Sequence, residues 1–388
     1  MLPRELYLSA PGNDTALWCS VSYTDQKLKR EEIHRTSGES DAYHNFQRRV
    51  SRDNGKTWSD LQMLPDVTSQ LEGGGIVNYP GGYHFDPVLG NSYQMKMRRI
   101  WPGMEIYTFN WGGHAHPFND HVFVIENDEK EVLLRYENGP VFDQENPFDP
   151  EFCASNCAYF GVAMDFASDG TAYFPIVCHT AKDDTAHTSG GIVLMRRDPA
   201  SGEWLTSNQQ YLSPERTSRG LLEPDVAVLK NGNILTVARG NDTPACPGRK
   251  WFSLSTDGGE TLSPVEEFRY DDGSSFYSPS SIHCFQRSSK NGKLYWLANI
   301  TPEPPEGSGP RYPLYIAEID ETNVAVRKDS LIEVDVRGDD EPNVLQLSNF
   351  SVIENRETLD IEIYLTRLGE DPEHFWHAPV YRYSFSPA

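Results

Sequence analysis

The chain has 388 residues, which is enough for one large domain or for up to three of ordinary size. Acidic residues outnumber basic ones by 57 to 34 and give a net charge of −23. Such a surface repels phosphate backbones and anionic lipid headgroups, so we expect neither a nucleic-acid partner nor a membrane partner. A few arginines can still line one pocket, so a small anionic ligand is not excluded.

The composition also narrows the class of fold. The 30 glycines, 27 prolines and 12% aromatic residues are typical of many short strands joined by tight turns. No run of 18 apolar residues predicts a membrane span, and the N-terminal residues show no secretory leader. We therefore expect a cytoplasmic protein, or a secreted or periplasmic one if a leader has been removed. The motifs typical of phosphate-binding loops, dinucleotide-binding folds, esterases and zinc proteases are missing.

The six cysteines are sparse for this length, and only Cys153 and Cys157 lie close together in the sequence. No second pair completes a zinc-type set, so we expect buried free thiols, with one or two disulfides as the alternative. No cofactor is predicted, and a structural calcium ion in the centre of the fold is left open.

One pattern, a strand followed by a polar turn and a second strand, recurs in chain order. Its five copies read FQRRVSRDNGKTWSD at Asp53, VFVIENDEKEVLLRY at Asp128, IVLMRRDPASGEWLT at Asp198, WFSLSTDGGETLSP at Asp257 and LYIAEIDETNVAVRK at Asp320. The intervals between these aspartates are 75, 70, 59 and 63 residues. Because a mean interval of about 67 residues divides the chain into nearly six units, we predict an all-β, six-bladed propeller with four-stranded antiparallel blades.

The two ends of the chain are predicted to close this ring. The C-terminal APVYRYSF and the N-terminal RELYLS would pair as the sixth hairpin, which hides strand edges that otherwise promote aggregation. No linker composition splits the chain, so residues 1–388 are interpreted as a single domain.

Two of the turns share the sharper pattern S-x-D-x-G-x-T. It is formed by Ser51, Asp53, Gly55 and Thr57, followed by Trp58, and again by Ser255, Asp257, Gly259 and Thr261, followed by Leu262. The aspartate can accept hydrogen bonds from amides of its own turn, and glycine tolerates the positive φ that the turn needs. We therefore interpret the motif as structural.

Segments rich in glycine and aromatic residues separate the hairpins, and we expect the loops 72–86, 101–121 and 302–311 to build a site. His114 and His116 are two residues apart, so both side chains can point into one site. A metal site, a lyase base and a group that binds substrate by hydrogen bonds are the alternatives for them. His84 is a similar candidate, and Trp111 and Tyr277 are candidates for stacking on or bonding to a sugar.

The S-x-D-x-G-x-T-W turns resemble the Asp boxes of the sialidase superfamily, whose members are six-bladed propellers. This resemblance implies an acidic-sugar pocket lined by arginines, with carboxylates for catalysis. By position in the family pattern, Asp41 matches the acid/base aspartate and Arg35 the arginine that precedes it. Glu223 and Arg239, sixteen residues apart, match the paired glutamate and the second arginine, and Arg311 matches the third. The first arginine of the family is missing, and Asn349 and Phe350 stand where its tyrosine nucleophile is expected.

Three functions follow from these residues. The first is an exo-acting glycoside hydrolase on an acidic or deoxy sugar, with Asp41 protonating the leaving oxygen and Glu223 acting as base. The second is a lyase that cleaves uronate-containing oligosaccharides or polysaccharides by β-elimination, using histidine and tyrosine. The third is a glycan-binding propeller without catalysis. In each case the expected partner is an oligosaccharide or polysaccharide.

Overall fold

A computed structural model describes residues 1–65, 67–109, 118–179 and 190–388. Its backbone divides into two compact units, one of Met1–Met63, Arg239–Trp251 and Glu266–Ala388, the other of Leu64–Ala238 and Phe252–Val265. That residues 1–388 form a single domain stays a prediction. Among the described residues, no helix combines the length and the apolar character that crossing a bilayer requires.

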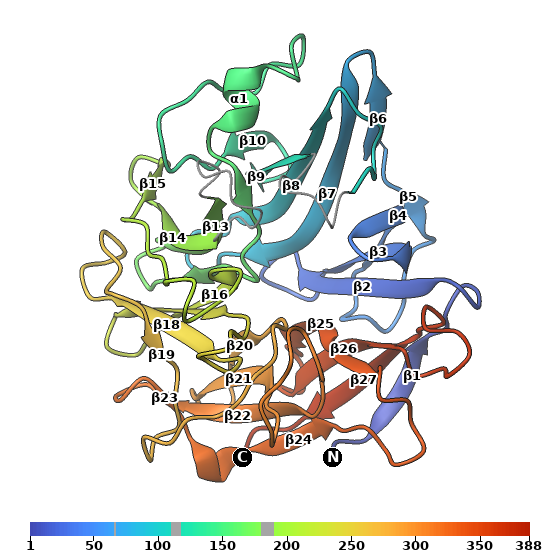
Figure 1. The fold of residues 1–388 in the computed structure, drawn as a ribbon, viewed down its shortest axis with the longest axis vertical. Coiled ribbons are helices and arrows are strands. Elements are labelled where there is room, and N and C mark those ends of the chain that lie inside the picture. The colour runs from blue at the N-terminus through green and yellow to red at the C-terminus, as the bar shows by residue number, and fades with distance from the viewer. Residues whose placement is uncertain (66, 110–117, 180–189) are drawn as a thin grey trace. The chain divides into compact units, whose positions relative to one another are not determined.

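Six antiparallel sheets follow one another along the chain, as predicted for the blades of a six-bladed β-propeller (Figure 1). The first three contain β2 (Ala16–Tyr23), β3 (Arg30–Glu39), β4 (Ala42–Ser51) and β5 (Gln62–Met63); β6 (Thr68–Leu71), β7 (Gly74–Phe85), β8 (Ser92–Pro102), β9 (Asn119–Glu126) and β10 (Lys130–Leu133); and β11 (Ala158–Tyr159), β12 (Asp165–Phe166), β13 (Ala172–His179), β14 (Gly190–Arg197) and β15 (Trp204–Thr206). The last three contain β16 (Leu222–Val228), β17 (Ile234–Arg239), β18 (Lys250–Ser255) and β19 (Glu266–Glu267); β20 (Cys284–Arg287), β21 (Leu294–Asn299), β22 (Leu314–Asp320), β23 (Ala325–Val326) and β24 (Ile332–Asp335); and β25 (Gln346–Glu354), β26 (Ile361–Leu368), β27 (Val380–Phe385) and β1 (Arg4–Leu8). The short helices α1 (Pro150–Ala154) and η1 (Lys328–Ser330) lie between strands.

Each of the five predicted hairpins is found at the outer side of a sheet. The turns at Asp53, Asp128, Asp198, Asp257 and Asp320 join β4 to β5, β9 to β10, β14 to β15, β18 to β19 and β22 to β23. The turn at Asp128 places Asn127 and Asp128 at φ 52° and 58°, which is the geometry of a tight hairpin turn that matches strand twist. The repeat found in the sequence is therefore a pair of consecutive antiparallel strands in five of the six sheets.

The predicted closure by the two termini is confirmed. β1 pairs antiparallel with β27, with Arg4 opposite Tyr383 and Leu6 opposite Tyr381. Figure 1 shows β1 beside the C-terminal strands of the same sheet. The N-terminal strand thus completes the last blade and covers the edge of β27.

Both S-x-D-x-G-x-T turns have the predicted hydrogen bonds. Asp53 Oδ1 accepts from Ser51 Oγ at 2.8 Å and from the Thr57 amide at 2.8 Å, and Oδ2 accepts from Thr57 Oγ1 at 2.6 Å. Asp257 repeats this arrangement with Ser255 and Thr261. Gly55 and Gly259 have φ of 84° and 87°, so the motif stabilises the turn, as expected.

One predicted loop is a strand. Residues 72–86 were expected to form a loop because they contain several glycines and a proline, but Gly74–Phe85 form β7. The glycines serve close packing instead of a turn, since a Cβ on Gly81 would lie 3.0 Å from both the Cβ and the backbone oxygen of Met95. A register irregularity between Pro80 and Tyr83 accommodates the proline.

Apolar faces of neighbouring sheets form the cores within each unit. In the second unit, Met95, Val124, Ile176 and Val193 share one buried cluster. In the first unit, Val21, Tyr364 and Val380 do the same, together with the buried Cys19. Fully burying such an aliphatic side chain contributes about 1.5–3 kcal/mol, so these faces are what hold the short strands together. All six cysteines are free thiols, and five are buried, as predicted.

Candidate functional site

Two of the predicted site residues meet on one backbone oxygen in the first unit. Arg239, the last residue of β17, donates from Nη1 to the carbonyl oxygen of Ser280 at 3.1 Å. Arg311 donates from Nη2 to the same oxygen, also at 3.1 Å. The two guanidinium groups, 72 positions apart in the chain, are thereby brought to a single point, and this arrangement is the centre of the candidate site.

Arg311 is held in place by further hydrogen bonds. Its Nε donates to the Ser308 carbonyl at 2.9 Å, and its Nη1 donates to Gln346 Oε1 at 3.2 Å and to Ser348 Oγ at 3.4 Å. The backbone is fixed as well, because the buried Asn299 amide donates to the Arg311 carbonyl at 3.0 Å. The guanidinium plane is therefore fixed before any ligand arrives, which lowers the entropy lost on binding.

A buried lysine fixes the segment that carries the Ser280 carbonyl. Lys250 is fully buried, and its Nζ donates to the carbonyl oxygens of Ser281 at 2.6 Å and of Pro279 at 3.3 Å. Three consecutive carbonyls, at positions 279, 280 and 281, are thus bound by cationic side chains. The three cationic side chains give this corner of the first unit a concentrated positive charge.

His283 responds to that positive charge. It is fully buried, and its Nδ1 accepts from the indole N–H of Trp296 at 3.1 Å. Burial lowers the pKa of His283 well below its usual range, and the charges of Lys250 and Arg239 lower it further. The imidazole is therefore neutral, with its proton on Nε2.

Glu223 lies in the second unit and has an unusual backbone. It is the second residue of β16 and precedes Pro224, and its φ is 42°. A non-glycine residue in this region costs of order 1–3 kcal/mol and is found disproportionately at functional positions. Glu223 lies one residue after the start of the first strand of the fourth sheet, whereas Arg239 is the last residue of the second strand.

His84, in β7 of the second unit, is linked to the neighbourhood of Glu223 by one short segment. The Met164 amide donates to His84 Nδ1 at 3.4 Å, and the Val162 amide donates to the Pro224 carbonyl at 2.8 Å. Burial lowers the pKa of His84 to about 4, so the ring is neutral near pH 7. Its Nε2 is buried and meets no hydrogen-bond acceptor within the described parts of the chain.

Asp41 and Arg35 belong to the first sheet. Asp41 is exposed at the turn between β3 and β4, with φ 63°. Arg35, in β3, donates from Nη1 to Ser20 Oγ at 3.4 Å and lies 4.9 Å from the centre of the Tyr43 ring. The dry surroundings expected for an acid/base aspartate are not present around this exposed side chain.

Tyr277 is partly exposed, and its ring lies under a cation. The guanidinium carbon of Arg249 is 4.5 Å from its centre, and Arg249 also donates to the Phe276 carbonyl at 2.7 Å. Trp111, His114 and His116 lie outside the described residues. Asp120 lies near the end of the predicted loop 101–121 and is described. It forms a bidentate ion pair with Arg99 of β8, with N–O distances of 2.7 and 2.8 Å.

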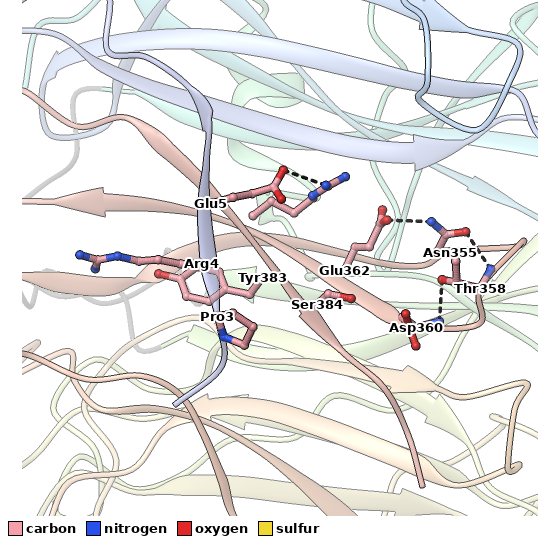
Figure 2. A pocket seen from close by; sticks show the side chains of 10 residues that line it. Pro3, Arg4, Glu5, Asn355, Thr358, Asp360, Glu362, Tyr383 and Ser384 are labelled. Carbon is pink, nitrogen blue, oxygen red and sulfur yellow. Dashed lines mark hydrogen bonds and ion pairs between the residues drawn. The ribbon is translucent and has the colours of Figure 1, made fainter.

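A separate hollow of about 390 Å³ is lined by residues of β1, β26 and β27 and of the turn between β25 and β26 (Figure 2). Two of its charged side chains are bound to neighbours, since Arg382 donates to Glu5 at 2.7 Å and Glu362 accepts from Asn355 at 2.8 Å. None of the residues predicted from the sequence lines it. We therefore place the candidate site at the arginine pair.

Lys250, Ser280 and His283 were missed by the sequence analysis. Ser280 contributes a backbone oxygen, which its side chain does not reveal, and Lys250 lies in a strand whose other residues have an ordinary composition. A lysine within the apolar strand KWFSLS was the one signal that could have marked it.

Comparison with known proteins gives the fold. No protein-family model and no curated protein sequence matches the chain. Among solved structures, a protein of unknown function from Dyadobacter fermentans has a TM-score of 0.62 at 12% identity, over 99% of this chain and 98% of that one. The sialidase NanB from Streptococcus pneumoniae has a TM-score of 0.58 at 12% identity, over 99% and 70%. The α-L-arabinanase from Penicillium chrysogenum has a TM-score of 0.55 at 12% identity, over 99% and 98%. The chain is a six-bladed β-propeller with the fold of the sialidases and related Asp-box glycosidases.

Proposed function

We propose that this protein is a carbohydrate-active enzyme, an exo-acting glycoside hydrolase on an acidic or deoxy sugar, with an acidic sugar favoured. The observation that carries the proposal is the convergence of Arg239 and Arg311 on the Ser280 carbonyl, beside Lys250. Guanidinium groups bind carboxylates by paired, charge-assisted hydrogen bonds, so this corner suits a sugar acid. The fold is shared with a sialidase and an arabinanase, which supports a sugar as the ligand.

In the proposed reaction, Arg239 and Arg311 orient the sugar, and Glu223 accepts a proton from the attacking water. The water oxygen bonds to the anomeric carbon as the glycosidic C–O bond breaks. Asp41 gives its proton to the leaving oxygen, which requires that the bound sugar cover this exposed carboxyl and keep it protonated. His84, neutral and with a proton on Nε2, is a donor suited to a sugar hydroxyl. A tyrosine nucleophile is not required in this scheme, which matches Asn349 and Phe350 at the position of the family tyrosine.

The test uses aryl glycosides of sugar acids, deoxy sugars and neutral sugars, with release of the aryl alcohol as the readout. We expect hydrolysis of an acidic or deoxy member. Glu223→Gln should lower kcat/KM by roughly 10²–10⁴-fold, because it removes general acid–base catalysis. Glu129→Gln, at an exposed turn of the same unit, should leave it unchanged.

Two results would contradict the proposal. An unsaturated product that absorbs in the ultraviolet would identify a lyase. Measurable sugar binding without turnover across the panel would identify a glycan-binding propeller.

A further inference from the structure

A second group of reactive side chains lies in the first sheet and has no part in the proposed reaction. Cys19 in β2 is directly opposite His34 in β3, and Glu32 is two residues before His34. Because side chains two residues apart share a strand face, all three point to the same side of the sheet. One thiol, one carboxylate oxygen and one imidazole nitrogen all lie within 4.8 Å of one another.

This cluster is buried. Cys19, Glu32 and His34 are 8%, 0% and 3% exposed. Cys19 also belongs to the apolar core between the first and last sheets, beside Val21 and Tyr364. A carboxylate, an imidazole and a thiol in an apolar core are costly unless they are bound to one another or to a metal ion.

We propose that Cys19, Glu32 and His34 bind a zinc ion. Thiolate sulfur, imidazole nitrogen and carboxylate oxygen are the three ligand types that zinc takes from proteins, at about 2.0–2.3 Å each. A tetrahedral ion with these bond lengths holds its ligands about 3.3–3.8 Å apart. The ligand atoms lie at most 4.8 Å apart, and the 2.8 Å hydrogen bond between His34 Nε2 and Glu32 Oε2 would give way to the two metal bonds.

The surroundings of Glu32 support this assignment. Arg49 donates from Nε to Glu32 Oε2 at 2.5 Å, and Tyr7 donates from its hydroxyl to Oε1. Such bonds orient a ligating carboxylate and are typical of the layer around a metal site. Arg49 is 18% exposed, so its charge stays in contact with water when the ion and a thiolate are present. Cys19 would bind as the thiolate and release its proton to solvent.

The site would also stabilise the closure of the fold. Tyr7 belongs to β1, the strand that completes the last sheet, and Glu32 belongs to the first sheet. An ion that fixes Glu32 therefore fixes its hydrogen bond to β1. Because the site is buried, the ion would enter during folding, and its binding free energy adds to the stability of the protein.

The experiment unfolds the full-length protein in denaturant with a chelator, refolds it with Co²⁺ in place of zinc and records the absorption spectrum. A thiolate bound to Co²⁺ gives an intense charge-transfer band in the near ultraviolet. We expect this band in the wild-type protein, with one equivalent of metal bound tightly. We also expect chelation to lower the unfolding temperature and added zinc to restore it.

Variants separate this site from other metal sites. Cys19→Ser should abolish the band, and His34→Gln should weaken Co²⁺ binding at least tenfold. Cys284→Ser changes another buried thiol of the same unit and should keep both the charge-transfer band and the affinity for Co²⁺. A wild-type spectrum without the band would overturn the proposal without recourse to any variant, and so would a band that persists in Cys19→Ser. Failure of this site would leave the proposed hydrolase unaffected.

Discussion

Lys250 has the least expected environment among the residues around the candidate site. A buried ammonium group is expensive, and here the carbonyls of Pro279 and Ser281 offset part of that cost. The same bonds fix the carbonyl of Ser280 between them, on which Arg239 and Arg311 converge. Lys250 is therefore a positioning residue for the arginine pair, and its burial is explained by the precision that a carboxylate pocket needs.

We predict that Lys250→Met raises KM for an acidic substrate about tenfold and changes kcat much less. A hydrogen bond from a charged donor contributes about 1.5–3 kcal/mol, and a loss of 1.4 kcal/mol weakens binding tenfold. Lys250→Arg should restore part of the affinity, and Lys56→Met, at an exposed position, serves as the control. Steady-state kinetics with an acidic and a neutral sugar decide the matter. An equal rise of KM for both sugars would show general loosening and contradict the positioning role.

The sequence predicted some of these residues and not others for a physical reason. Arg239, Arg311 and Glu223 could be named as candidates because the segments that carry them resemble stretches of the sialidase superfamily. The Ser280 carbonyl could not, because a backbone oxygen is supplied by any residue. Its role depends on Lys250 and on chain segments far apart in sequence, which only the folded chain brings together.

At the scale of the element, the two S-x-D-x-G-x-T turns are maintained by their carboxylates. Hydrogen bonds from Thr57 and Ser51 lower the pKa of Asp53 to about 2, and those from Thr261 and Ser255 do the same for Asp257. An aspartate whose pKa is lower in the folded state stabilises the fold at pH values above its unfolded pKa of about 3.8. That stabilisation is lost as the pH falls through about 2.

We therefore predict that the double variant Asp53→Asn and Asp257→Asn has a lower unfolding temperature than the wild-type protein at about pH 6. This gap in unfolding temperature should close as the pH falls from about 4 to about 2. At low pH the protonated aspartates and the asparagines carry the same charge, so the two proteins should converge. Thermal unfolding followed by circular dichroism across this range measures the gap. Asp60→Asn, exposed and outside the motif, should show no gap. A gap of constant size down to pH 2 would count against the carboxylate as its cause.

The element that the sequence analysis misjudged is β7. Glycine and proline usually interrupt strands, so residues 72–86 were interpreted as a loop. In the structure Gly81 lies where the strand passes close to Met95, a contact that depends on tertiary packing and leaves no local signal. The hairpins were predicted correctly because their turns are determined by residues that are adjacent in the sequence.

For the whole molecule, the pairing of β1 with β27 is the feature that joins the two ends of the chain. β1 contributes the partly buried Tyr7 and Leu8 to the core of the last sheet. Without β1, the backbone groups of β27 would form an open edge, which is a template for association between molecules. The strand thus serves both stability and solubility.

We predict that deleting residues 1–8 lowers the free energy of unfolding by about 3 kcal/mol, the value expected for two partly buried side chains. The shortened protein should also self-associate. Deleting residues 1–3 leaves β1 intact and should have a much smaller effect. Denaturant unfolding and light scattering measure the two properties, and a monomer of unchanged stability after the longer deletion would refute this role of β1.

The central claim is that Arg239 and Arg311 form the carboxylate-binding part of a sugar site. A crystal structure of the Glu223→Gln protein with a bound sugar acid tests it most directly. We expect the sugar carboxylate to lie within hydrogen-bond distance of both guanidinium groups. A sugar bound elsewhere, with both arginines still engaged only by the protein, would contradict it.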